Sequence, residues 1–139
     1  MAQVVPTNSE DEEVIFSYTR AQALADGVLV DVTQSASEAR FRFPTAISAD
    51  LHARLTPNEH EKSLGQSYAG RLWDVLFLAA LAGQRVHFTN LASFQVSLFE
   101  FEEDQLRVTY CGNLITLWVV IGDGDDGEPV ITIGFPEDF

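Results

Sequence analysis

One segment of the chain, Ser67–Ala82, predicts a helix that is apolar almost all the way round. Such a helix is buried on most sides, so the rest of the fold has to be built around it. Its two charges, Arg71 and Asp74, are three residues apart and therefore share one face. Gly83 is expected to end the helix. The sequence thus predicts a single central helix that other elements cover.

The segments that follow this helix have the patterns of strands. Phe94–Phe101 alternates between apolar and polar residues, Leu106–Tyr110 follows a turn, and Val130–Phe135 comes after a glycine-rich turn. Leu114–Ile121 is almost continuously apolar, which predicts a central strand covered on both faces. Four successive strands favour an antiparallel meander with the helix packed across it.

Short helices are expected in the N-terminal half, each beginning at a Ser or Thr that can cap it. The polar segment Thr56–Gln66 is predicted to be a loop. The expected elements are a helix Tyr18–Asp26 capped by Thr19 and Gln22 and ended by Gly27, a strand Val28–Val32, a helix from Ser35 with a Glu38 capping box, an extended Thr45–Ile47, and a helix Ala49–Leu55 capped by Ser48.

The chain of 139 residues has the size of one domain. Residues 1–13 are polar and end in four consecutive acids, which predicts a flexible acidic lead. Residues 14–139 are expected to form a single α+β domain. It should contain a mainly antiparallel four-stranded sheet, one central buried helix and short N-terminal helices.

The charge of the chain restricts its partners. It has 21 acidic and 8 basic residues, a net charge of -13, although 46% of its residues are hydrophobic. A disordered acidic tail lacks such apolar residues, so this chain should fold and present a surface of carboxylates. That surface repels nucleic acid and attracts basic proteins. Seven of the eight bases are arginines, which we expect to be internal partners of acids.

Signals for other compartments are missing from the sequence. No apolar run reaches the roughly 18 residues of a membrane span. The segment Met1–Glu13 has neither the basic nor the apolar region of a signal peptide. Cys111 is alone, so no internal disulfide is expected. These features favour the cytoplasm and no membrane partner.

The candidate binding residues are acids in two clusters, one after the Phe94–Phe101 strand and one in the Gly122–Pro129 turn. Acidic clusters that converge on one face would imitate phosphates and fit the nucleic-acid-binding groove of a basic protein. The alternative is that each cluster only keeps the protein soluble. The candidate residues are Glu100, Glu102, Glu103, Asp104, Asp123, Asp125, Asp126 and Glu128.

Several short stretches resemble motifs for catalysis, metal binding or cofactor binding, but the residues around each of them do not fit the motif. Gly122–Glu128 matches a dinucleotide-binding glycine pattern, but a strand follows it and its aspartates repel a pyrophosphate. The same segment lacks the ligand order of a calcium loop, so a hairpin loop is predicted.

His60 lies between two glutamates, but the sequence offers no second pair of ligands at the spacing of a zinc site. The stretch Gly65–Gly70 is one residue too long for the G-x-S-x-G nucleophile elbow, so Ser67 is expected to cap a helix. Cys111 has no neighbouring histidine in the sequence, and we expect a strand residue. No catalytic residue, metal ligand or cofactor is predicted.

Five stretches, which cover between a quarter and a third of the chain, have a recognisable pattern. They are Tyr18–Ala23 with Asp26–Val32, Glu38–Ala46, Gly70–Leu76 and Asp125–Ile133. These stretches resemble a family of small uncharacterised proteins carried by bacterial plasmids and phages. The resemblance implies a mobile-element setting inside a bacterial cell. It also implies a shared framework that includes Arg71, Trp73, Asp74 and the Asp125–Pro129 turn.

These observations lead to three hypotheses. The first is a non-enzymatic accessory protein of a mobile element that binds a basic host protein. In its finer form it inhibits a nucleic-acid-targeting defence system, such as CRISPR, as a DNA mimic. The second is a small enzyme whose carboxylates and Arg71 line a pocket, which requires a polar cleft. The third is a homodimer that uses an apolar face with Phe99 or Phe101.

Overall fold

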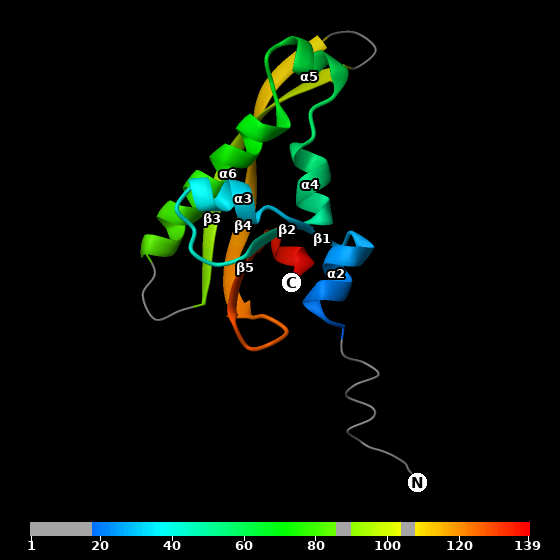
Figure 1. The fold of residues 1–139 in the computed structure, drawn as a ribbon. Coiled ribbons are helices and arrows are strands. Elements are labelled where there is room, and N and C mark those ends of the chain that lie inside the picture. The colour runs from blue at the N-terminus through cyan, green and yellow to red at the C-terminus, as the bar shows by residue number, and fades with distance from the viewer. Residues whose placement is uncertain (1–17, 86–89, 104–107) are drawn as a thin grey trace.

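The computed structural model describes residues 18–85, 90–103 and 108–139, and within these ranges the side chains of all residues except 101–103 and 108–111. The predicted lead over residues 1–13 lies outside the described residues. The fold is α+β, with a five-stranded mixed sheet and helices on both of its faces (Figure 1). None of the described helices is long and apolar enough to cross a lipid bilayer.

Helices and strands alternate in the N-terminal half, and strands follow the longest helix. The elements are α2 Arg20–Asp26, β1 Leu29–Asp31, α3 Thr33–Glu38, β2 Thr45–Ser48, α4 Ala49–Leu55, α5 Glu59–Ser63, α6 Tyr68–Arg85, β3 Leu91–Glu103, β4 Val108–Asp123, β5 Pro129–Gly134 and the 3-10 helix η1 Pro136–Asp138.

The sheet has the strand order β1-β2-β5-β4-β3. Neighbours are antiparallel except β2 and β5, which run parallel. The predicted four-stranded antiparallel meander is therefore wrong in two respects. Leu106–Tyr110 and Leu114–Ile121 were expected as two strands, but β4 runs unbroken because Gly112 and Asn113 stay paired with β3. In addition, β1 and β2 join the sheet beside β5.

The main core lies between one face of the sheet and the helices α3, α4 and α6 (Figure 1). Alternate residues of the strands point into it, as the pleat requires. The largest fully buried side chains of this core are Ile47, Leu51, Leu55, Leu76, Leu98, Leu117 and Ile133.

The opposite face of the sheet is covered over β2 and β5 by α2 and η1. Arg20 of α2 donates to Thr132 Oγ1, and Asp138 of η1 accepts from Ser48 Oγ. Along β4 this cover is incomplete, since Leu114 is 64% exposed. The prediction that this strand is covered on both faces is thus wrong.

Most helix starts agree with their caps, and two local predictions fail. Thr19 and Ser48 cap α2 and α4 as expected. However, α3 begins at Thr33 after Val32, which makes no side-chain cap, so the expected start at Ser35 is wrong. The predicted Thr56–Gln66 loop contains α5, because Asn58 and Glu61 form a capping box there.

The helix α6 differs from its prediction in length and burial. It continues through Gly83 to Arg85. Trp73, Phe77 and Leu81 are 44%, 51% and 37% exposed, so burial on most sides is wrong. The reason is that α6 belongs to the outer layer of a two-layer core, and one face of such a helix remains at the surface.

Candidate binding surface and polar pocket

The two predicted acidic clusters lie far apart along the β3–β4 hairpin. Glu100 is beside Cys111 near the start of β4, whereas Asp123 is beside Pro129 at its end. Cys111 and Asp123 are twelve positions apart in one strand, which corresponds to roughly 40 Å. The clusters therefore do not share one edge. The side chains of Glu102 and Glu103, and all of Asp104, lie outside the described residues.

Glu100 is engaged in contacts within the protein. Its carboxylate accepts from Arg54 Nε at 2.9 Å and Nη2 at 3.1 Å, and from Asn113 Nδ2 at 2.6 Å. Its side chain is only 16% exposed. The hydrogen bond from Arg54, together with that from Asn113, lowers the pKa of Glu100 against the opposing effect of burial. Glu100 is thus a charge that the fold has already paired.

The acids of the β4–β5 loop have two different roles. Asp125 accepts from the backbone N–H groups of Arg20 at 2.8 Å and Ala21 at 3.0 Å, so it caps α2 from another part of the chain. These hydrogen bonds lower the pKa of Asp125. Glu128 accepts from the Asp126 N–H at 2.9 Å and fixes the loop. The side chains of Asp123 and Asp126 are exposed to solvent.

A further acidic cluster was not found from the sequence. Asp26, Asp50 and Asp138 line a shallow pocket between α2, the start of α4 and η1. Asp138 Oδ2 accepts from Ser48 Oγ at 2.7 Å and from the Phe135 N–H at 2.8 Å. The hydrogen bond with Asp138, and then its charge, raise the pKa of Asp50, with smaller contributions from burial and Glu137. No local signal links these positions, because up to 112 residues separate them.

Both groups of acids gather around α2, at the end of the molecule that holds the C-terminus and the β4–β5 loop (Figure 1). Arg20 lies among them, and its guanidinium is directed inward, onto Thr132 Oγ1 and the Ile131 carbonyl. We call this region the acidic surface. It consists of Asp26, Asp50, Asp125, Asp126, Glu128, Glu137 and Asp138.

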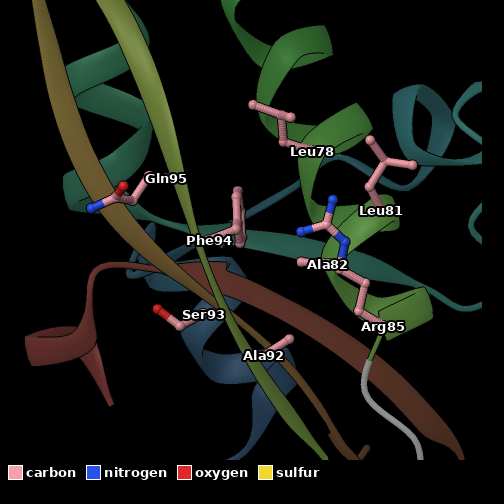
Figure 2. Close-up of a pocket in the computed structure, with 8 residues that line it drawn as sticks. All are labelled: Leu78, Leu81, Ala82, Arg85, Ala92, Ser93, Phe94 and Gln95. Atoms are coloured by element: carbon pink, nitrogen blue, oxygen red, sulfur yellow. The ribbon is translucent and has the colours of Figure 1, made fainter.

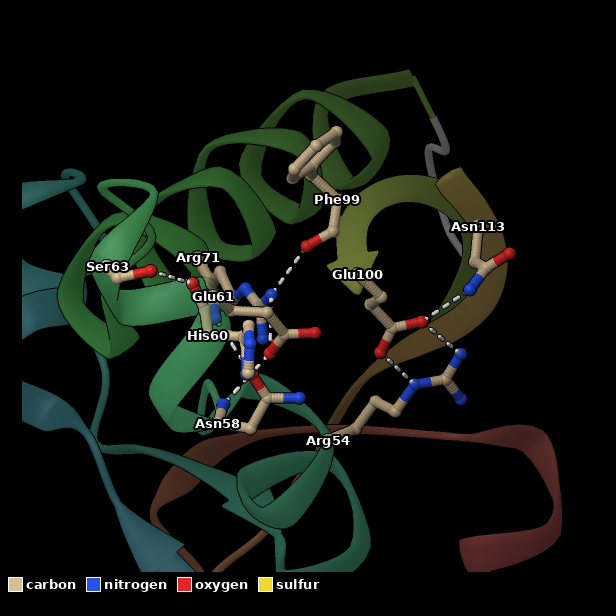
Figure 3. Close-up of polar contacts among 9 residues, drawn as sticks. All are labelled: Arg54, Asn58, His60, Glu61, Ser63, Arg71, Phe99, Glu100 and Asn113. Atoms are coloured by element: carbon tan, nitrogen blue, oxygen red, sulfur yellow. Dashed lines mark hydrogen bonds and ion pairs between the residues drawn. The ribbon is translucent and has the colours of Figure 1, made fainter. Parts of the chain in front are cut away.

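A polar pocket lies at the opposite end, where α5 and the start of α6 meet β3 (Figure 3). Arg71 Nη2 donates to the Phe99 carbonyl at 2.6 Å and lies 3.2 Å from Glu61 Oε1. Both side chains of this ion pair are about 95% buried, being 4% and 6% exposed. Arg71 and Asp74 were expected to share one face of α6, but Arg71 is buried and Asp74 is exposed.

The chemistry of this pocket is limited because its charged side chains already form ion pairs with one another. It has a volume of about 400 Å³ and contains two arginines and two glutamates. Each glutamate lies against an arginine, and the pKa of Glu100 is lowered. Acid–base catalysis near neutral pH needs a carboxyl group whose pKa is raised. The lining residues are Ala53, Arg54, Thr56, Asn58, Glu61, Arg71, Glu100 and Asn113.

Two polar side chains at or near the start of α6 make structural contacts. Ser67 Oγ accepts from the Gly70 N–H, as expected of a helix cap. His52 Nδ1 is 2.8 Å from Tyr68 Oη. Cys111 lies in β4, but its side chain is not described. His87 lies outside the described residues. In the part of the chain that the structure describes, no three His, Cys, Asp or Glu side chains could hold a metal ion together.

Comparison with known proteins places the chain in a family. It belongs to a family of unknown function (DUF6573), whose model matches residues 7–139. No curated protein matches it, and no solved structure does. The family agrees with the resemblance to small uncharacterised proteins.

Proposed function

We propose that this chain is a non-enzymatic acidic protein that binds a basic partner through the acidic surface around α2. The observation that carries the proposal is that Asp50 and Asp138 line one shallow pocket, where Asp138 and the nearby Glu137 raise the pKa of Asp50. Like charges that line one pocket repel each other, so the arrangement costs stability at neutral pH. A basic partner that approaches this surface would relieve that cost.

The distribution of arginines supports the same proposal. Arg54 and Arg71 lie at the polar pocket, each against a glutamate. Arg40 and Arg42 lie beside the C-terminal half of α6. These four arginines line other pockets than the one at the acidic surface, and Arg20, which lies at that surface, directs its guanidinium inward. A lopsided charge of this kind steers basic partners toward one side of the molecule.

In its finer form, the proposal concerns the setting and the partner. The chain acts as an accessory protein of a mobile genetic element in the bacterial cytoplasm. Its partner is a basic, nucleic-acid-binding host protein, and the carboxylates occupy the groove that normally holds phosphates. Inhibition of a nucleic-acid-targeting defence system by DNA mimicry is the consequence. The net charge of -13 supports this form.

The test is capture of the partner from a bacterial host extract, followed by titration of the purified partner at increasing salt. Asp50→Asn with Asp126→Asn neutralises two charges of the acidic surface. Glu38→Gln with Glu59→Gln makes the same change in net charge on α3 and α5. We expect only the first pair to weaken binding, by about tenfold at physiological salt, because the Debye length of about 8 Å there limits each surface charge to its own neighbourhood.

Equal weakening by both pairs of substitutions would contradict a defined acidic surface, and binding that does not change with salt would contradict the charge-based contact. Duplex DNA added as a competitor tests the mimicry. If the DNA displaces the chain from its partner, the two share a site. If a ternary complex forms, the partner is bound elsewhere and the mimicry is wrong.

The polar pocket supports a second candidate, a small enzyme with a carboxylate and Arg71 pocket. The favouring observation is that Glu61, Arg71, Arg54 and Glu100 do line a common cleft. A ligand would have to displace one of the two ion pairs. If the wild-type chain shows enzymatic turnover and the folded Glu100→Gln variant does not, the enzyme is favoured over the non-enzymatic binding protein.

A further inference from the structure

The strand β3 is the last in the sheet order and has an open edge. The Ile121 N–H donates to the Asn90 carbonyl at 2.8 Å, which fixes the phase of the β3–β4 ladder. Alternate residues of an antiparallel strand bond to the neighbour, and those between them point away. Ser93, Gln95 and Ser97 therefore direct their N–H and C=O groups outward, where no described residue bonds them.

Further along β3 the edge is closed. The Phe99 carbonyl belongs to the same outward set, and Arg71 Nη2 occupies it. This contact confirms the phase independently. It also limits the part of the edge that another strand can reach to the stretch before Phe99.

An apolar groove runs beside the open stretch, between α6 and β3 (Figure 2). Leu78, Leu81 and Ala82 of the helix and Phe94 of the strand line it, and its volume is about 340 Å³. A strand added next to β3 would bury alternate side chains in such a groove. The backbone edge and the groove are thus two parts of one docking surface.

The open stretch is complementary to itself. When a second β3 runs antiparallel with Gln95 opposite the partner's Gln95, Ser93 faces the partner's Ser97. Each of these outward pairs exchanges two hydrogen bonds. On the groove side, Phe94 then meets the partner's Val96, so apolar side chains pair with apolar side chains.

The helix α6 carries a charge pattern with the same symmetry. Asp74, Leu78, Leu81 and Arg85 are spaced by four, three and four residues, so they share one flank. Three of them, Leu78, Leu81 and Arg85, line the groove. The midpoint of Asp74 and Arg85 falls between Leu78 and Leu81, which line the groove together with Gln95. The other flank is covered by the Arg40–Phe43 segment.

We propose that two copies of the chain join through this surface as a symmetric dimer. The two β3 strands pair antiparallel about Gln95 and continue the sheet. The two α6 helices lie antiparallel above them, with Asp74 against the partner's Arg85 at both ends. The axes of packed helices lie about 10 Å apart, and two strand spacings in a sheet have about the same width. The contact between the two α6 helices and the pairing of the two β3 strands can therefore form in the same dimer.

The dimer leaves the acidic surface free. That surface lies around α2, near β1, and the proposed interface is at the opposite edge of the sheet. A dimer would therefore present two acidic surfaces, pointing outward from its ends. The interface uses other residues than Phe99, whose side chain is on the face of the sheet away from α6.

Sedimentation equilibrium of the full chain, with light scattering on a sizing column, tests the dimer. We expect a dimer that dissociates on dilution. Gln95→Pro removes one outward N–H without touching a bond to β4, so it should give a folded monomer. Gln95→Ala keeps that N–H and should remain dimeric. Circular dichroism checks that both variants are folded.

Charge exchange on α6 tests the orientation and does not depend on the proline variant. Asp74→Arg and Arg85→Asp should each weaken the dimer by about tenfold or more, because like charges then face each other at both ends. The double variant should recover the wild-type affinity within a few-fold. Asp126→Arg makes the same charge change far from the interface and should not weaken the dimer.

A wild-type chain that sediments as a monomer at its highest soluble concentration overturns the proposal. So does a dimer that survives Gln95→Pro and the single charge reversals. A dimer that the reversals weaken, but that the double variant does not restore, contradicts the antiparallel arrangement of the α6 helices.

Discussion

The polar pocket and the acidic surface contain the same kind of residue in opposite situations. In the pocket, Glu61 and Glu100 are mostly buried and lie against Arg71 and Arg54. Around α2, carboxylates lie next to one another, and the hydrogen bond with Asp138 raises the pKa of Asp50. The comparison teaches that acidic residues in this chain serve either the fold or the surface. The position of the arginines decides which.

The largest expected effect is at the pocket. Arg71→Met should lower the free energy of unfolding by about 3–5 kcal/mol, because it leaves the Glu61 charge buried without its partner. Urea unfolding at neutral pH measures this. Adding Glu61→Gln should restore part of the loss. The control is Lys62→Met, which breaks the exposed pair with Glu59 and should cost under about 0.5 kcal/mol. Similar costs for both would end the distinction between the two regions.

The next effect concerns Glu100. Glu100→Gln should cost about 1 kcal/mol at neutral pH, since the partner Arg54 is partly exposed and solvent weakens the pair. The pKa of Glu100 is lowered in the folded state. Its stabilisation is therefore present above the ordinary carboxyl pKa and is lost as the pH falls through the lowered value. Urea titrations should show the variant and the wild type converging below about pH 4. A difference that persists in acid would exclude the charge as its cause.

A smaller effect is expected at the loop acid that caps α2. Asp125→Ala should lower Tm by about 3 °C, because the N–H groups of Arg20 and Ala21 lose their acceptor. The neighbouring Asp126→Ala is the matched control, since the exposed Asp126 side chain makes no such contact, and its Tm should stay within about 1 °C. Calorimetry measures both variants. Equal shifts would mean that Asp125 belongs to the surface alone.

The smallest effect has the opposite sign. Asp50→Asn should raise Tm by about 1 °C at neutral pH, because it removes repulsion from Asp138 and Glu137. Because the pKa of Asp50 is raised in the folded state, protonation of this carboxyl favours folding. Ionisation of Asp50 therefore lowers the stability of the fold, and this loss appears as the pH rises through the raised pKa. The gain in Tm should therefore fade as the pH is lowered below about 4. A lower Tm for the variant at neutral pH would show that Asp50 stabilises the fold.

Local features of the fold could be predicted from the sequence because their contacts span only a few residues. The Thr19 and Gln22 capping box, the left-handed Gly27 and the Ser48 cap are all present. The missed α5 belongs to the same class, since Asn58 and Glu61 form a capping box that the sequence also displays. Strand boundaries were less predictable, because pairing with β3 keeps Gly112 and Asn113 extended where their own preferences favour a turn.

The site could be predicted only in part. Three acids of the Gly122–Pro129 turn, Asp125, Asp126 and Glu128, belong to the acidic surface. Glu100 does not, because it is bound to Arg54 across 46 positions of the chain. Asp26, Asp50 and Asp138 were not singled out, since they form no cluster in the sequence. The parallel pairing of β2 with β5 brings Ser48 and Asp138 together, and no pattern in either segment reveals it.

By itself, the sequence determined the helix caps, the hairpin loop and the large excess of negative charge, because each depends on neighbouring residues or on a sum over the chain. The tertiary structure alone decided which carboxylates are neutralised, which repel one another, and which edge of the sheet is open. These depend on distances between positions far apart in the chain. Such distances are set by strand order and register, and the electrostatic energy of a carboxylate changes steeply with them.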